Sequence, residues 1–188
     1  ELKELTNKIC DLFGCANVST LPDKIMSSLF SQNAPLIFEK YKELCPDLKI
    51  DWLQKVYQFY HAEGKQKKQD YTPVSLAKLV AYLIVLRQEK IVYDCCSGSG
   101  ALTIQKWSIN PNLKFVCEEL DEKVIPILLF NLCIRNIEAT VINKDILTRK
   151  VICSYRTIKG STYSSVQRLM FSEMELLKAD VAIFQPAI

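Results

Sequence analysis

The chain has 188 residues, of which 49% are hydrophobic, and a formal net charge of +3. This composition is typical of a soluble globular protein with one well-buried core and a smaller appendage. No apolar run reaches the roughly 18 residues that a membrane span needs, and the charge alone does not indicate nucleic-acid binding. The N-terminus lacks the basic start and apolar centre of a secretory signal, so we expect a cytoplasmic protein.

The eight cysteines and single histidine do not have the spacing of a metal site. No pair forms Cys-x-x-Cys, and most of the cysteines stand in apolar runs such as "KFVCEEL" and "FNLCIRN". We therefore predict no metal and expect reduced, mostly buried thiols. Cys95 and Cys96 are adjacent, a spacing that rarely satisfies disulfide geometry.

Residues 1–62 predict helices, because apolar residues recur every three or four positions in "LPDKIMSSLF", "APLIFEKYKEL" and "DWLQKVYQFYHA". The polar, basic stretch "EGKQKKQD" at 63–70 then indicates a linker or loop. We accordingly divide the chain into a helical N-terminal segment, residues 1–68, and a second domain, residues 69–188.

Helices and apolar strands alternate in the second domain. We predict strands at "KIVYD", "LKFVCEEL", "ATVINKDIL" and "ADVAIF", and helices at "TPVSLAKLVAYLIVL", "GALTIQKWSI", "DEKVIPILLFNLCIRN" and "SSVQRLMFSEMELL". This alternation is typical of a doubly wound α/β domain with a parallel sheet.

Two of the chain's five glycines, Gly98 and Gly100, follow the first predicted strand, which ends in Asp94. Both glycines let the backbone turn tightly and approach a ligand at the crevice of such a sheet. The spacing is not that of a phosphate-binding P-loop, and Thr103 stands where a dinucleotide fingerprint has its third glycine. A tight connection without a ligand is the alternative.

Carboxylates follow the next two predicted strands. A carboxylate at the end of the second strand, where Glu118, Glu119 and Asp121 lie, can accept both ribose hydroxyls of an adenosyl ligand. Asp145, at the end of the third strand, can accept a hydrogen bond from an adenine amine or can cap a turn.

Together these motifs resemble the S-adenosylmethionine-dependent methyltransferases, and most closely the DNA adenine methylases of type I restriction-modification systems, the N-6 DNA methylase family. The resemblance covers about residues 69–188 and implies a class I methyltransferase, Rossmann-like fold behind the helical segment. "DYTPVSLAKLV" is similar to the family's Phe/Tyr-Thr-Pro motif, and "VYDCCSGSGAL" to its Asp-Pro-x-Cys-Gly-x-Gly loop, with Cys95 in place of the proline.

The resemblance implies S-adenosylmethionine as cofactor and assigns roles residue by residue. Glu119 takes the ribose, Leu120 and Ile146 flank the adenine, and Asp145 contacts its amine. The implied cofactor-binding residues are Tyr71, Thr72, Pro73, Asp94, Gly98, Gly100, Glu119, Leu120, Asp145 and Ile146.

The catalytic motif departs from the family. Where the family has Asn/Asp-Pro-Pro-Tyr/Phe, this chain has Gln185, Pro186, Ala187 and Ile188. The resemblance implies that Gln185, Pro186 and Ile188 are the catalytic residues. Gln185 carries its amide one methylene further out, and Ile188 offers no ring for a flipped base to stack on. Positioning decides such transfers, and a misplacement of about 1 Å can cost on the order of 100-fold.

Basic residues gather between Lys144 and Arg168, where six basic residues and one acid give +6 − 1 = +5. The segment connects the third and fourth strand regions, and Tyr155 and Tyr163 stand within it. This mixture suits phosphate contact and base stacking, although an ordinary solvated loop is the alternative. The predicted DNA contacts are Arg149, Lys150, Arg156 and Lys159.

The sequence therefore predicts a DNA adenine methyltransferase of restriction-modification or phage type. The alternatives are a non-catalytic cofactor- or DNA-binding relative, favoured by the altered tetrapeptide, and a protein glutamine methyltransferase, disfavoured by the basic segment. The chain stops after the fourth predicted strand, so we expect the sheet to be incomplete and a specificity subunit, self-association or further sequence to cover it.

Overall fold

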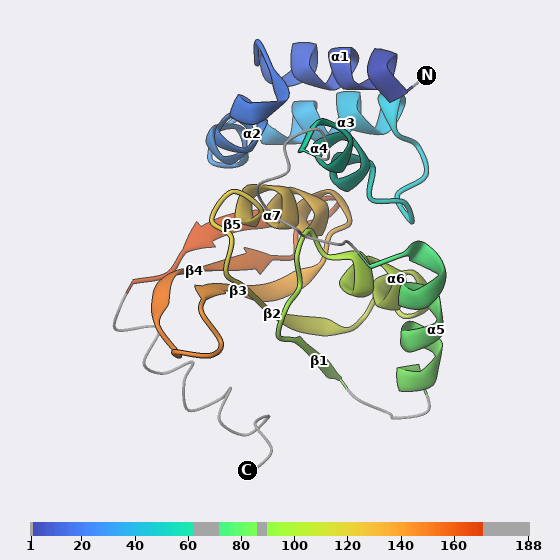
Figure 1. Ribbon diagram of the computed structural model, residues 1–188, viewed down its shortest axis with the longest axis vertical. Helices are drawn as coiled ribbons and strands as arrows, with labels where there is room; N and C mark the ends of the chain where they lie inside the picture. The colour runs from blue at the N-terminus through green and yellow to red at the C-terminus, as the bar shows by residue number, and fades with distance from the viewer. Residues whose placement is uncertain (1, 62–71, 86–89, 171–188) are drawn as a thin grey trace.

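The structure, a computed structural model, describes residues 2–61, 72–85 and 90–170 (Figure 1). The N-terminal segment is helical, as its apolar spacing predicts. Its elements are α1 (Leu2–Phe13), the short 3-10 helix η1 (Val18–Thr20), α2 (Leu21–Leu29), α3 (Ala34–Leu44) and α4 (Trp52–His61). Pro22 and Pro35 lie in the first turns of α2 and α3, where a missing backbone N–H costs nothing. None of the described helices is both long and apolar enough to span a membrane.

Three parallel strands and their helices form the centre of the second part of the chain. After α5 (Val74–Val85) come β1 (Ile91–Asp94), α6 (Ala101–Ile109), β2 (Lys114–Glu119), α7 (Ile125–Ile134) and β3 (Glu138–Lys144). β1 pairs with β2, and β2 with β3, both in parallel. The carboxyl ends of these strands therefore share one edge of the sheet, where α/β proteins bind their ligands.

The sheet continues as an antiparallel hairpin that the sequence pattern did not predict. β4 (Val151–Ile158) pairs with β3 and β5 (Ser165–Arg168) pairs with β4, which gives the order β1-β2-β3-β4-β5. The predicted helix from Ser164 is therefore wrong over β5, and the basic connection is mostly strand. The alternation of buried and exposed side chains explains why this segment forms a strand. Along β4, Tyr155 and Thr157 are buried, while Arg156 and Ile158 are exposed. The predicted strand "ADVAIF" lies outside the described residues.

Helix α7 lies between the sheet and the N-terminal helices (Figure 1). All ten of its residues are buried, because both sides of the helix meet apolar partners. Phe130 shows this arrangement: its ring packs against Phe13 of α1 at 5.3 Å and Tyr41 of α3 at 4.9 Å between centroids. The N-terminal helices and the sheet consequently share one continuous hydrophobic core.

Candidate cofactor site

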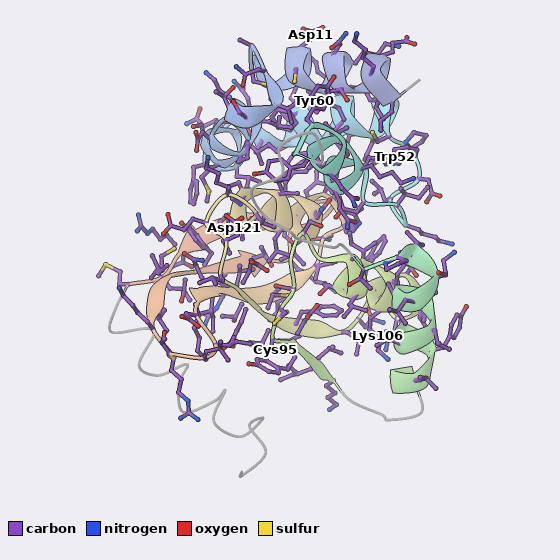
Figure 2. All side chains as sticks on the ribbon, in the orientation of Figure 1. Asp11, Trp52, Tyr60, Cys95, Lys106 and Asp121 are labelled. Atoms are coloured by element: carbon purple, nitrogen blue, oxygen red, sulfur yellow. The ribbon has the colours of Figure 1, made fainter. Side chains whose placement is uncertain are left out.

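The turn after β1, where Cys95 is labelled in Figure 2, depends on two glycines in left-handed conformations. Gly98 has φ 54° and Gly100 has φ 98°, a region that disfavours residues with a Cβ atom. A Cβ added to Gly98 would meet nothing within 4 Å, so the space above it is open to a ligand. A Cβ on Gly100 would lie 3.0 Å from Leu128 Cδ1. Gly100 thus lets α7 approach closely, and its contact with a ligand stays a prediction.

Glu119 at the end of β2 holds this turn in place. Its Oε2 accepts a hydrogen bond from the Gly98 amide at 2.8 Å, and its Oε1 accepts one from the Asp121 amide at 2.8 Å. The backbone N–H and the hydroxyl of Ser97 both donate to the carbonyl of Glu118 at 3.0 Å. The turn after β1 and the end of β2 therefore form one hydrogen-bonded unit.

Asp94 closes β1 at the bottom of the turn. Its Oδ2 accepts a hydrogen bond from the Thr103 hydroxyl at 3.3 Å. Burial raises the pKa of this carboxyl, although the Cys96 N–H and the Thr103 hydroxyl act in the opposite direction, and the nearby charge of Glu119 raises it further. A positive charge bound nearby would favour the ionised form of Asp94.

Two apolar side chains stand exposed where β2 and β3 end. Leu120 is 57% exposed and Ile146 is 37% exposed, and such exposure at a crevice suits contact with a flat apolar ring. Asn143 ties the two strand ends together by donating from Nδ2 to the carbonyls of Glu119 at 2.8 Å and Leu120 at 2.9 Å.

Asp145 caps the turn that follows β3. Its Oδ1 accepts hydrogen bonds from the Leu147 and Thr148 amides, at 2.9 Å and 3.3 Å. The hydroxyl and the amide of Thr148, with the Leu147 amide, lower the pKa of Asp145. The capping alternative thus describes Asp145 in this structure, and its contact with an adenine amine stays a prediction.

The remaining predicted cofactor and catalytic residues lie at or beyond the described ranges. Thr72 is half-buried and Pro73 is exposed just before α5, where the Pro73 carbonyl accepts a hydrogen bond from Ala77 at 2.9 Å. Tyr71 and the catalytic Gln185, Pro186 and Ile188 lie outside the described residues.

The four predicted DNA contacts do not gather in one place. Arg149, with φ 60°, and Lys150 lie in the turn between β3 and β4, where the Lys150 carbonyl accepts a hydrogen bond from Asp145 at the crevice edge. Arg156 is exposed in the middle of β4. Lys159 follows the far end of β4 and donates to the carbonyl of Pro111 at 3.1 Å. Only the first pair adjoins the crevice.

Of the two tyrosines of the basic segment, Tyr155 is buried and Tyr163 is partly buried against the core. Tyr155 is 8% exposed, and burial raises its pKa to about 12. Tyr163 packs on Phe38 of α3, with ring centroids 5.0 Å apart, and its hydroxyl donates to Glu39. The expectation that they stack bases is therefore wrong in this structure.

A buried ion pair beneath the site was not predicted from the sequence. Glu118 is 1% exposed and accepts hydrogen bonds from the Tyr93 hydroxyl at 2.7 Å and from Lys144 Nζ at 2.8 Å. Burial and the Glu118 carboxylate raise the pKa of Tyr93. The sequence signal for this ion pair is a set of three polar residues on the same face of neighbouring strands, namely Tyr93, Glu118 and Lys144. Their pairing occupies Lys144, which belongs to the basic segment expected to face DNA.

The parallel sheet and the turn at its carboxyl edge together define a Rossmann-like methyltransferase fold. A family model described as N-6 DNA Methylase matches residues 50–157, and the chain belongs to this family. It is similar to the type I restriction enzyme MjaVIII methylase subunit of Methanocaldococcus jannaschii, with 28% identity over 82 residues. The matched part is 42% of this chain and 14% of that relative. No solved structure matches significantly.

Proposed function

We propose that this chain carries the cofactor-binding part of an S-adenosylmethionine-dependent DNA adenine methyltransferase of restriction-modification or phage type. The observation that carries the proposal is the contact between Glu119 and Gly98. It places a carboxylate beside an open, left-handed glycine at the edge where parallel strands end. Family membership supports the same function.

The residues at this edge fit S-adenosylmethionine, which supplies a methyl group when bound. Each Glu119 oxygen accepts one backbone hydrogen bond and keeps a second lone pair for a ribose hydroxyl. Leu120 and Ile146 would flank the adenine, and Asp145 would accept from its amine. Asp94 offers a partially buried carboxylate toward the cationic end of the ligand. Tyr71, Thr72 and Pro73 complete the proposed set.

Methyl transfer to adenine is assigned to the tetrapeptide. Gln185 would accept a hydrogen bond from the target amine, Pro186 would keep the chain extended, and Ile188 would give apolar contact to the flipped base. Arg149 and Lys150 would contact phosphates near the crevice. Arg156 and Lys159 stay proposed contacts for more distant phosphates.

The chain is a small part of the relative it matches, so partners are part of the proposal. DNA is the substrate, and a specificity subunit or a second copy would complete the assembly. The exposed apolar residues of α5 support a covered surface there: Val74, Leu76, Leu79, Tyr82 and Leu83 are each at least 42% exposed. Contiguous apolar surface of this kind marks contact sites.

Calorimetric titration of the full-length protein with S-adenosylmethionine and with its demethylated product tests the cofactor assignment. We expect binding of both ligands, and a folded protein that gives no heat with either would overturn it. Labelled methyl incorporation into unmethylated DNA then tests the activity.

One alternative has a specific observation in its favour. Gln185 and Ile188 replace the family's amide and aromatic residues, which supports a relative that binds cofactor or DNA without transferring methyl groups. Cofactor binding with no methyl incorporation, in the complete assembly, would select this alternative.

A further inference from the structure

A buried polar side chain on α7 holds the glycine turn from beneath. Asn131 is 1% exposed, and its Nδ2 donates to the carbonyl of Ser99, between the two glycines, at 2.9 Å. Arg135, one helical turn further, donates through Nη1 to Asn131 Oδ1 at 2.9 Å and to the Asn131 carbonyl at 2.8 Å. Arg135 therefore fixes the amide orientation in which Asn131 can donate to the turn.

The same arginine reaches the N-terminal segment. Its Nε donates to the carbonyl of Leu48 at 2.7 Å and its Nη2 to that of Ile50 at 3.1 Å, both in the connection between α3 and α4. The next residue is Asp51, which is 6% exposed and whose Oδ1 accepts a hydrogen bond from the Gln54 amide at 2.9 Å. Trp52, labelled in Figure 2, follows at the start of α4.

Asp51 supplies the opposite charge for this network. Burial raises the pKa of Asp51, and the Ser99 hydroxyl and the Arg135 charge act to lower it. Burial lowers the pKa of Arg135, and Asp51 is the largest influence raising it. Within the described part of the chain, Asp51 Oδ2 and Ser99 Oγ are buried without a hydrogen-bond partner. The Ser99 hydroxyl and the Asn131 side chain also act to lower the pKa of Asp51, so Asp51 lies beside the turn as well as beside Arg135.

Well-packed apolar side chains often hold two helices together as firmly as a buried ion pair does. What a satisfied polar network adds is a defined position for each hydrogen-bonded atom. Here one of those atoms is the Ser99 carbonyl, one residue from the Gly98 amide that Glu119 binds. The network therefore reaches the site that the cofactor would occupy, although none of its three side chains lies at the crevice edge.

We propose that Asn131, Arg135 and Asp51 are positioning residues for the glycine turn, and that they make the connection between α3 and α4 a structural part of the cofactor site. The identity of the ligand rests on the proposed function, whereas the coupling of turn and segment does not.

Asn131→Asp is the sharpest test, because the carboxylate still accepts from Arg135 but cannot donate to Ser99. Gln105→Glu is the matched control. Gln105 is a buried α6 amide whose Nε2 donates to the carbonyl of Lys49 in the same segment at 2.7 Å, and it has no hydrogen bond to the turn. Amide hydrogen exchange of residues 97–100 in the full chain without ligand is measured first, with amides of β2 and β3 as reference for global unfolding.

We expect the rate of amide hydrogen exchange of residues 97–100 to rise about tenfold or more in Asn131→Asp. In Gln105→Glu the rate should stay within about twofold of wild type. The Kd for S-adenosylmethionine should rise about tenfold in the first variant alone. Unchanged turn exchange in Asn131→Asp, or an equal rise in both variants, would overturn the inference. A wild-type protein that binds no S-adenosylmethionine would remove the proposed function, while the exchange comparison would still decide the coupling.

Asp51→Asn is the second variant, for use if Asn131→Asp does not fold. It keeps an oxygen to accept from the Gln54 backbone N–H and removes the charge that raises the pKa of Arg135. Amide hydrogen exchange of residues 97–100 should again be faster than in Gln105→Glu. An exchange rate no higher than in that control would contradict the proposal.

Discussion

The Glu119 carboxylate accepts a hydrogen bond from the Gly98 amide at 2.8 Å, which joins the end of β2 to the turn after β1. Two residues 21 positions apart in sequence thereby share one task. The carboxylate sets the shape of the turn before any ligand arrives, so changing it affects both the turn and the binding of a ribose.

Replacing Glu119 by alanine should weaken S-adenosylmethionine binding by about 1–3 kcal/mol, because ribose hydroxyls and backbone amides lose their acceptor. Glu119→Gln retains one side-chain oxygen and should lose less. Titration calorimetry compares the two variants with wild type. Equal affinity in all three proteins would remove Glu119 from the residues that touch the ligand.

Replacing Gly98 or Gly100 by valine should have different effects on stability and on ligand binding. Gly100→Val combines a left-handed backbone, which costs about 1–2 kcal/mol, with overpacking against Leu128, which costs about 1–3 kcal/mol. Gly98→Val has the backbone cost but open space, so it should stay folded and block the ligand. Chemical denaturation and calorimetry separate the effects. A Gly98→Val protein that binds as wild type does would show that the ligand lies elsewhere.

Asp94→Asn should stabilise the ligand-free protein at neutral pH. Burial raises the pKa of Asp94 in the folded state, so the folded state holds its proton more tightly than the unfolded chain does. The corresponding stability is present below the ordinary pKa and is lost as pH rises through the folded pKa. Asparagine has no proton to lose.

Thermal unfolding of wild type and Asp94→Asn from about pH 3 to about pH 8 checks this prediction. The Tm difference should be near zero at the acid end and grow with pH, by about 2–4 °C for each kcal/mol. Asp51 also has a raised pKa but is common to both proteins, so the difference isolates Asp94. A Tm advantage that is independent of pH would contradict the titration argument.

The proposed DNA-binding residues should divide according to their places in the fold. Changing Arg149 and Lys150 to alanine should lower the log–log salt slope for duplex DNA by about 0.9 for each phosphate that the protein no longer neutralises. Lys8→Ala, in the exposed Glu4–Lys8 pair of α1, is the control and should leave the slope at the wild-type value. If the slope of the double variant stays at the wild-type value, Arg149 and Lys150 belong to a solvated turn that does not contact phosphates.

The tetrapeptide gives a prediction about methyl transfer itself. The triple change Gln185→Asn, Ala187→Pro and Ile188→Phe in the full-length protein should raise methyl transfer to adenine about tenfold or more, or about 1.4 kcal/mol in the transition state. The added ring supplies base stacking, worth about 1–3 kcal/mol. Labelled methyl incorporation is the measurement. Robust wild-type transfer would show that the altered residues are a working variant.

Local patterns in the sequence sufficed for helices α1–α7 and for the three parallel strands. Apolar runs ending in Asp94 and Glu119 mark strand ends, and the small-residue turn at Gly98 marks the crevice edge. The hairpin was missed because its charges suggested a loop, although Tyr155 and Thr157 alternate with exposed residues as a strand requires.

The buried network could not be predicted in the same way. Asp51 and Arg135 are far apart in sequence, and each alone is typical of a solvated surface. Only the packing of α7 beneath the N-terminal helices brings them together. The need for glycine at position 100 could not be predicted either, because it comes from the close approach of Leu128 on a different helix.

The burial of α7 on both sides also affects how the chain folds during translation. Helices α1–α4 are made before α7, and residues 62–134 must follow before α7 can join them, which takes roughly 4–15 s at about 5–20 residues per second. During that interval apolar side chains such as Ile25 and Phe38 lack the helix they pack against in the native core. The nascent chain therefore passes through an aggregation-prone stage, during which chaperone binding would protect the N-terminal helices until translation reaches Ile134.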